Sequence, residues 1–347
     1  MPPSPRPELR GLVPVSHGGD ASPGVLDFST GVSPLAPPAA VCEALRAADV
    51  TRYPHPTALP FRERVAVAHG VAPEEVAAGA GSTELIWAAA RAFGGVGRSV
   101  LVLGPAFGEY AQAARASGAN VTELSCLRRP WRLEAIEAAA QRASPSLVFV
   151  GRPNNPSLHV LDTAVIAGLA KCLPDALVVV DEAYLPMFDG VAPMAFSPSV
   201  AILRSLTKAF ALPGLRLGYL VGSPPIAQAM RSALPPWNVS AGASAAGIAA
   251  LAENEALVTG RAEVGRLRRA LCARLAAAGA HIEAAGGPFV LCRVPSAARF
   301  ARSLLARGVR VRDCTSFGLP EHVRVGARPE SEQEILARAW RQTEEAG

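Results

Sequence analysis

The chain contains almost no lysine. Only Lys171 and Lys208 are lysines, against 32 arginines. Arginine stays protonated in proteins, whereas a desolvated lysine can lose its proton and form a Schiff base with an aldehyde. A lysine kept in so arginine-rich a sequence is therefore a candidate nucleophile, although a surface lysine at the start of a helix is the more ordinary explanation of Lys208 taken alone.

Other absences exclude whole classes of function. The six cysteines form no CxxC pair or Cys–His cluster, so we expect free thiols in a reducing compartment and no metal site. The first residues lack the apolar run of a signal peptide, and no run of about 18 apolar residues suggests a membrane span, so we expect a cytoplasmic protein. The net charge is only +5, and the densest basic segment, LRRPWR at 127–132, is short. We therefore expect no nucleic-acid partner.

The apolar patterns that are present predict two domains after an arm. We expect a Pro- and Gly-rich arm over 1–37, a large α/β domain over 38–235 and a smaller α+β domain over 236–347. In the large domain, helical patterns alternate with five uninterrupted apolar runs, at 99–103, 146–150, 176–180, 200–204 and 217–221. Such runs are typical of a mainly parallel sheet that helices cover on both faces.

The residues that follow these runs form a candidate site, because ligands of open parallel sheets bind beyond the carboxyl ends of the strands. These residues are Phe107 and Tyr110, Asn154 and Asn155, Asp181 and Tyr184, and Ser205, Thr207 and Lys208. An earlier turn, Gly81-Ser82-Thr83, leads into a predicted helix. An amine, a carboxylate, amides, phenols and an aromatic ring are thus expected at one edge of one sheet.

Pyridoxal 5′-phosphate would use these groups. Lys208 offers an amine for its aldehyde, and Asp181 offers a carboxylate that keeps its ring nitrogen protonated. Asn155 and Tyr184 can donate hydrogen bonds to its phenolic oxygen, and Phe107 can pack on its ring. Each residue alone is explained as a turn, a cap or packing. Their order after successive strands predicts the cofactor.

The phosphate of that cofactor would also find partners. Exposed amides and hydroxyls at the helix start formed by Gly81, Ser82 and Thr83 suit an anion. Ser205 and the guanidinium of Arg216, which follows the lysine by eight residues, would add a hydroxyl and a bidentate contact.

Over nearly its whole length the sequence resembles the aspartate-aminotransferase-like, fold type I pyridoxal-phosphate enzymes. The matching motifs are SHGGD at 16–20, LDFSTGVSPL at 26–35, RYPHP at 52–56, GPAFGEY at 104–110, PNNP at 153–156, VVVDEAY at 178–184, LRSLTKAFALPGLRLGYLVG at 203–222 and PPWNVSA at 235–241. Because the HGGD arm precedes the DFSTG segment, the chain most resembles the threonine-phosphate decarboxylases of cobalamin biosynthesis. The histidinol-phosphate aminotransferases are similar too.

This resemblance implies the roles given above for Lys208, Asp181 and the other cofactor residues, and it adds four more. Tyr53 would reach the cofactor phosphate of a neighbouring subunit, which implies a homodimer with shared sites. Arg324 matches the arginine that binds the substrate carboxylate. Arg312 and His17 match positions near a substrate phosphate, although a strand arginine and a loop histidine at the surface are equally ordinary explanations.

The chain also departs from the family pattern. Gly31 stands where the decarboxylases can carry Asn, and Ser33 stands where the family commonly has Asn. The usual NNPTG has become NNPSL, with Ser157 and Leu158, and Arg152 precedes it where a small residue is usual. We expect these departures to affect substrate recognition and to leave cofactor binding intact.

Two reactions are consistent with the resemblance. The arm motif favours decarboxylation of L-threonine O-3-phosphate to (R)-1-aminopropan-2-ol O-phosphate. The alternative is transamination of a phosphorylated substrate such as histidinol phosphate, which the same residues would serve. A cofactor-binding regulator without catalytic activity would need a DNA-reading domain, and about 35 arm residues cannot form one.

Overall fold

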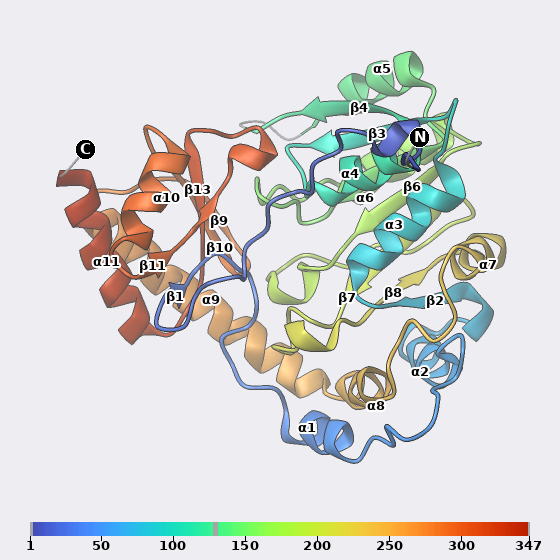
Figure 1. The fold of residues 1–347 in the computed structure, drawn as a ribbon, viewed down its shortest axis with the longest axis horizontal. Coiled ribbons are helices and arrows are strands. Elements are labelled where there is room, and N and C mark those ends of the chain that lie inside the picture. The colour runs from blue at the N-terminus through green and yellow to red at the C-terminus, as the bar shows by residue number, and fades with distance from the viewer. Residues whose placement is uncertain (1–2, 128–130, 346–347) are drawn as a thin grey trace.

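The computed structural model describes residues 3–127 and 131–345, and its larger part is built on one seven-stranded sheet (Figure 1). The middle of the basic segment LRRPWR, residues 128–130, lies outside the described residues. The strands run in the order β2-β8-β7-β6-β5-β3-β4, and β8 is antiparallel to both of its neighbours while the other pairs are parallel. Their bounds are β2 Val76–Gly79, β3 Ser99–Gly104, β4 Asn120–Ser125, β5 Leu147–Gly151, β6 Leu177–Asp181, β7 Val200–Ser205 and β8 Gly218–Val221. The mainly parallel sheet predicted from the sequence is confirmed.

Helices cover both faces of this sheet, as uninterrupted apolar strands require. One face packs against α3 (Ser82–Phe93), α4 (Glu109–Ala116) and α7 (Pro224–Ser232). The other face packs against α5 (Leu133–Ala143) and α6 (Thr163–Cys172). Alternate residues of each strand point to opposite faces: Val100 and Val102 enter the first core, and Leu101 and Leu103 enter the second.

Three further helices close the edge of the sheet at β2 and β8. They are α1 (Ala39–Arg46), α2 (Leu59–His69) and α8 (Ala241–Ala250). Val41, Phe61 and Ala246, one from each helix, share a core with Tyr219 of β8. The helix α8 thus packs beside the large sheet, although the sequence analysis assigned residues from 236 onward to the second domain. The domain bounds stay a prediction.

The second body is an antiparallel sheet in the order β12-β13-β10-β9, with helices on one side. Its strands are β9 His281–Gly286, β10 Phe289–Arg293, β12 Arg312–Asp313 and β13 His322–Gly326. Its helices are α9 Asn254–Ala277, α10 Ala297–Leu305 and α11 Glu330–Glu345. Figure 1 shows this body in orange and red, beside the large sheet. In residues 3–127 and 131–345, no helix combines the length and the hydrophobicity that crossing a bilayer would take.

The N-terminal segment connects the two bodies. Before residue 20 it runs along α4, where Gln112 Nε2 donates a hydrogen bond to the Val13 carbonyl at 3.1 Å. It then reaches the second body, where β1 (Leu26–Asp27) pairs in parallel with β11 (Val309–Arg310) (Figure 1). These pairings bring residues far apart in sequence to one place beside the large sheet.

Strand directions explain where a site can form. The parallel strands β6 and β7 end at Asp181 and Ser205. Because β8 is antiparallel, it begins at this same edge, and Gly218 is paired with Ser205 and with Gly79 of β2. The segments before β8 and after β2 therefore meet the carboxyl ends of the central strands.

Candidate active site

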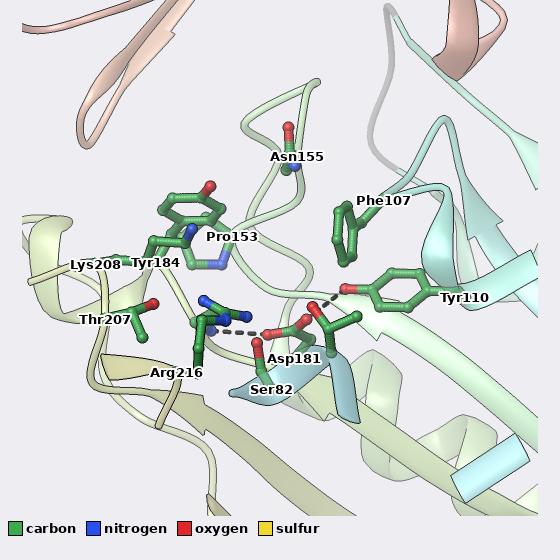
Figure 2. A pocket seen from close by; sticks show the side chains of 12 residues that line it. Ser82, Phe107, Tyr110, Pro153, Asn155, Asp181, Tyr184, Thr207, Lys208 and Arg216 are labelled. Atoms are coloured by element: carbon green, nitrogen blue, oxygen red, sulfur yellow. Dashed lines mark hydrogen bonds between the residues drawn. The ribbon is translucent and has the colours of Figure 1, made fainter. Parts of the chain in front are cut away.

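A buried carboxylate forms the floor of a cavity at this edge. Asp181, the last residue of β6, is only 7% exposed. Its Oδ2 accepts a hydrogen bond from the Tyr110 hydroxyl at 2.7 Å, and its Oδ1 accepts one from the Ala183 amide at 2.9 Å (Figure 2). Burial raises the pKa of Asp181, while the hydrogen bonds from Tyr110 and Ala183 oppose that rise. A cation above this carboxylate would stabilise its charged form.

Lys208 lies in the same cavity, on the loop that follows β7. Its Nζ is 5.9 Å from the centre of the Tyr184 ring. Figure 2 shows Lys208 and Tyr184 on one side of Asp181 and Phe107 on the other. The backbone amide of Ser33 donates a hydrogen bond to the Lys208 carbonyl at 2.8 Å, so the chain before α1 supports the lysine loop.

Next to the lysine, the start of α3 and the segment before β8 form an anion cradle. Gly81 has a φ of +86°, and a Cβ there would lie 2.6 Å from Nη2 of Arg216. Only glycine allows the guanidinium to approach this helix N-terminus so closely. Arg216 itself has a φ of +53°, which is strained for a residue with a side chain and is typical of functional sites. Ser82 and Thr83 line the cavity beside it.

A pair of hydroxyls lies close to this cradle. The Oγ of Ser205 and the Oγ1 of Thr207 are 2.8 Å apart, and both residues are buried. Thr207 lines the cavity, whereas Ser205 does not. The helix N-terminus, the guanidinium and these hydroxyls are the groups that a phosphate prefers.

The upper part of the cavity is aromatic and amide-bearing. Phe107, Asn155 and Tyr184 line it, as the sequence analysis expected (Figure 2). The Oδ1 of Asn155 accepts a hydrogen bond from Arg324, which leaves the Asn155 amide NH₂ to donate into the cavity.

Two buried arginines from the second body face an adjoining cavity, which also contains Lys208 and Tyr184. Arg324 on β13 donates to the Ser29 carbonyl at 2.8 Å and to Asn155, and its guanidinium carbon is 3.9 Å from the centre of the Phe289 ring. Burial lowers the pKa of Arg324. Its partners among the described residues are neutral, so this is a buried cation whose desolvation no carboxylate among them compensates.

Arg312 on β12 is the second of these arginines. It donates to the Ser16 carbonyl and to the Ser316 hydroxyl, each at 2.6 Å. Its guanidinium carbon is 5.1 Å from the centre of the Phe317 ring. Burial and the nearby charge of Arg324 lower the pKa of Arg312. It too has neutral partners among the residues that the structure describes.

His17 reaches the wall of this cavity from the N-terminal arm. Its Nε2 is 2.7 Å from Oε1 of Glu109, the first residue of α4, and its ring centre is 5.6 Å from that of Phe107. The structure therefore brings His17, Arg312 and Arg324 together around one cavity beside Lys208. Their roles toward a substrate stay predictions.

Tyr53 lies elsewhere. It lines neither of these cavities, its surface is 84% exposed, and its ring centre is 5.1 Å from that of Trp237. Within one chain it has no role in the site, so its contribution to a neighbouring subunit stays a prediction.

Two of the departures from the family pattern have structural explanations. A Cβ at Gly31 would lie 2.0 Å from the ring of Phe289, so this ring occupies the space that a side chain at position 31 would need. Arg152 is buried against the carboxylate of Glu182, with Nη1 and Oε1 2.9 Å apart. It is therefore part of the support behind the strands and does not line the described cavities.

The other departures shape the backbone. Leu158 has a φ of +65°, which glycine adopts more readily. Its Cβ lies close to the position that a Cβ on Gly286 would occupy. Ser157 Oγ accepts a hydrogen bond from Asn154 Nδ2 at 2.7 Å. Asn154 is thus a structural amide, and Asn155 is the one in the cavity.

Sequence reasoning did not assign a role to several residues of the site. Tyr110 orients Asp181, Thr207 pairs with Ser205, and Glu109 anchors His17. The signal for Tyr110 and Glu109 was present in GPAFGEY, where both stand on the first turn of α4 close to Phe107.

Comparison with known proteins agrees with this geometry. Residues 23–340 match the family described as aminotransferase class I and II. A histidinol-phosphate aminotransferase of Anaeromyxobacter sp. (strain Fw109-5) is 36% identical over 319 residues, which cover 88% of this chain and 86% of that protein. The histidinol-phosphate aminotransferase of Rhodospirillum centenum is 32% identical, with 97% of each chain covered.

Solved structures share the fold. Aspartate aminotransferase from Thermus thermophilus with maleate has a TM-score of 0.81 at 26% identity, covering 92% of each chain. Histidinol-phosphate aminotransferase from Sinorhizobium meliloti in complex with pyridoxal 5′-phosphate has a TM-score of 0.83 at 24% identity, covering 92% of this chain and 90% of that one.

These relatives change the order of the two predicted reactions. The arm motif favoured the decarboxylase, but the names of the relatives support the aminotransferase alternative, and decarboxylation is not confirmed. The donor set fits the predicted cofactor, because the buried carboxylate of Asp181 lines the same cavity as Lys208, and Arg216 closely approaches Gly81 at the start of α3 beside them. With its fold and its cofactor, pyridoxal phosphate, as the sequence predicted, the chain belongs to the class I and II aminotransferase family.

Proposed function

We propose that this protein is an aminotransferase that moves an amino group between a phosphorylated amine of the histidinol phosphate type and a 2-oxo acid. The observation that carries the proposal is the pair of buried arginines, Arg312 and Arg324, which face the cavity of Lys208 without an acidic partner among the described residues. The relatives named histidinol-phosphate aminotransferases support it.

The residues that would hold pyridoxal phosphate follow from the cavity. Asp181, oriented by Tyr110, would accept a hydrogen bond from the protonated ring nitrogen. The phosphate would lie between the start of α3 and Arg216, and Phe107 and Tyr184 would flank the ring. When bound, the cofactor supplies a cationic, electron-withdrawing ring that stabilises negative charge on the α-carbon of a substrate amine.

Lys208 would act twice. Its amine would hold the cofactor between turnovers, and when free it would be the base that takes the proton from the substrate α-carbon. The Lys208 carbonyl is held by the Ser33 amide, which limits how far the loop carrying this amine can shift. Asp181 would stabilise the positive charge of the ring nitrogen, and its carboxylate is held in place because leaving its two hydrogen bonds would leave buried donors unpaired.

The two arginines would bind the charged ends of the substrates. Arg324, which contacts Asn155, would bind a carboxylate near the cofactor, and Arg312, which contacts the arm at Ser16, would bind a more distant anion. A 2-oxo dicarboxylic acid has both anions, whereas a phosphorylated amine has one. The same pocket can serve both half-reactions if each substrate uses the guanidinium that it needs.

Decarboxylation of L-threonine O-3-phosphate is a second candidate, because a specific feature favours it. This substrate carries a carboxylate and a phosphate together, and His17 of the HGGD arm lies in the wall next to Arg312. In this reaction Arg324 would hold the substrate carboxylate in the fixed orientation that its loss as CO₂ requires.

The experiment is to supply the purified holoenzyme with histidinol phosphate plus 2-oxoglutarate, and separately with threonine phosphate. We expect glutamate to form in the first mixture and no CO₂ in the second. Release of CO₂ from threonine phosphate without glutamate formation would overturn the main proposal in favour of the second candidate. A Lys208→Ala variant should lose turnover in either case, and full activity of that variant would refute both reactions.

We also propose a homodimer in which Tyr53 reaches the cofactor phosphate of the neighbouring subunit. The exposed Tyr53–Trp237 pair supports it, since such a large aromatic surface is typical of an interface. A Tyr53→Phe variant should bind the cofactor more weakly without a change in the mass of the particle in solution. Unchanged cofactor affinity would count against this role.

A further inference from the structure

The cavity wall contains a carboxylate that the mechanism above does not use. Glu109 begins α4 directly after Phe107 and Gly108, and its side chain is almost fully buried. Its Oε2 accepts a hydrogen bond from Trp87 Nε1 at 2.7 Å, and its Oε1 lies 2.7 Å from His17 Nε2. Because an indole N–H can only donate, Trp87 fixes the carboxylate in one orientation, with its other oxygen toward His17.

The surroundings keep Glu109 ionised. The hydrogen bond from His17 lowers the pKa of the Glu109 carboxyl, although burial opposes it. The carboxylate also stands at the N-terminus of α4, where a negative charge is favourable. An ionised carboxylate accepts hydrogen bonds only, so the Nε2 of His17 must carry the proton that lies between them.

This contact decides what His17 can offer to the cavity. With Nε2 directed at Glu109, Nδ1 is the ring nitrogen that remains for a ligand. A neutral ring that donates through Nε2 has an unprotonated Nδ1, which repels an anion. Only the imidazolium presents Nδ1–H as a donor. A phosphate next to Nδ1 would therefore find a hydrogen-bond donor only on the protonated ring.

Most of the other charged groups around His17 are cations. The titratable groups that line the same cavity are Tyr184, Lys208, Arg216, Arg312 and Arg324, in addition to Glu109. The cavity on the other side of the arm adds Arg302, Arg310 and Asp313. Among the described residues that line the cavity of Lys208 and Arg324, Glu109 is the one acid.

We propose that Glu109 is a positioning residue that keeps His17 protonated and turned so that its Nδ1–H faces the phosphate of the substrate. The inference rests on the proposed function in one respect, namely that the substrate carries a phosphate. The arm supports the same geometry: Val15 lies against Gly108, where a Cβ would come within 2.8 Å of Cγ1, and Arg312 holds the Ser16 carbonyl. The two residues that precede His17 in the chain are thus held in place.

The test uses the holoenzyme, Glu109→Gln, His17→Gln and the double variant. Glu109→Gln keeps the size of the side chain and removes its charge. We expect the His17 ring in Glu109→Gln to lose its proton about one pH unit lower in an NMR titration. We expect KM for histidinol phosphate to rise about tenfold near neutral pH, with kcat within about twofold. Glu123→Gln, which alters an exposed carboxylate on β4, is the matched control and should change neither quantity.

The double variant separates positioning from a purely structural role. Since Glu109 acts through His17, the double variant should be no weaker than His17→Gln alone. Glu109→Asp retains the charge, so at each pH its KM should lie between the KM of Glu109→Gln and that of the wild type. If Glu109→Gln fails to fold, Trp87→Phe is measured in its place and should weaken binding less, because the carboxylate keeps its charge but loses its fixed orientation.

Failure of this inference differs from failure of the proposed function. Calorimetry measures the affinity of the holoenzyme for inorganic phosphate without any turnover. We expect this affinity to fall about tenfold in Glu109→Gln. If the wild type turns over no phosphorylated amine, the proposed function is wrong, and the titration and phosphate binding still decide the role of Glu109. An unchanged His17 titration and unchanged phosphate binding in a folded Glu109→Gln, or independent additive effects in the double variant, would overturn the inference.

Discussion

Two pairs of arginines occupy opposite situations in this protein. Arg152, which is buried, and Arg204, which is partly buried, both contact Glu182, whose side chain is 0% exposed, with nitrogen–oxygen distances of 2.9 and 2.7 Å. Arg312 and Arg324 are both buried, but their described partners are carbonyls, hydroxyls, an amide and aromatic rings. The first pair has its anion within the chain, and the second pair has no anion among the described residues.

This difference distinguishes arginines that support the fold from arginines that are available to bind a ligand. A buried guanidinium loses its hydration, and a neighbouring carboxylate compensates for that loss within the fold. Where the described residues supply no carboxylate, an anionic ligand could provide the compensation, so the proposed function expects part of the substrate's binding free energy to be prepared during folding. The same residue type can thus serve two purposes, and the presence of one glutamate distinguishes them.

The largest effect is expected at that glutamate. Glu182→Gln leaves two guanidinium groups buried around a neutral amide, and we expect the free energy of unfolding to fall by about 3–5 kcal/mol. Denaturation in urea measures it. Glu123→Gln disrupts an exposed pair with Arg115 and should have no measurable effect. A loss below about 1 kcal/mol in Glu182→Gln would show that the arginines do not depend on their acid.

A smaller effect is expected in the cavity, where a substitution should change catalysis and not stability. Arg324→Met should lower kcat/KM about 100-fold, since a charge-assisted contact with the substrate is worth about 1.5–3 kcal/mol. The unfolding free energy of the cofactor-free protein should change little, because the variant also removes an uncompensated buried charge. Steady-state kinetics and urea denaturation of the same preparation give both values.

The matched control for Arg324→Met is Arg152→Met. Arg152→Met removes an arginine that has an acidic partner. We therefore expect the reverse of the Arg324→Met result, with a clear fall in the free energy of unfolding and a weaker effect on KM. If both variants lost stability to the same extent while retaining substrate affinity, the distinction between the two pairs would not hold.

The smallest expected effect concerns a histidine near the supporting pair. Burial, and then the charge of Arg204, lower the pKa of His69 from 6.5 to about 4. Between these two values the unfolded chain binds a proton that the folded protein does not, so stability falls as the pH decreases from 6.5 to 4. Solvent near His69 screens the effect, and we expect less than about 1 kcal/mol.

A His69→Gln variant checks this effect. Its stability should depend less on pH over this interval than that of the wild type, as measured by urea denaturation at several pH values. Since His69 Nε2 lies 2.9 Å from the Tyr219 hydroxyl, glutamine can keep a hydrogen bond there. An unchanged pH dependence would assign the effect to another group.

Much of the cavity floor could be predicted from the sequence, because local patterns determine it. Apolar runs predicted β3, β5, β6, β7 and β8, and the strand ends then located Asp181, Asn155 and Lys208 beside one another. Two strands of the sheet were not predicted. The short β2 reads VAAG, which is buried but has only one β-branched residue and so gives little strand signal. The edge strand β4 reads NVTELS, whose side chains are largely exposed and form no apolar run.

The upper part of the cavity depends on contacts between distant segments, which no local pattern encodes. The placement of Arg312 beside Ser16 and of Arg324 beside Asn155 requires the second body to be packed on the first. The resemblance identified these arginines and His17, but not the partner that holds His17. Glu109 was unrecognised because a glutamate at the start of a helix has an ordinary explanation as a favourable end charge.

The contact between Gly31 and Phe289 constrains how this pocket can evolve. The ring of Phe289 lies against the guanidinium of Arg324 and fills the volume beside position 31. A side chain gained at 31 would displace the ring, and a smaller residue at 289 would first leave a void under the arginine. Each substitution alone should therefore be unfavourable. Replacing Gly31 by a residue with an amide side chain should require a simultaneous change at Phe289, so we expect the two positions to change together.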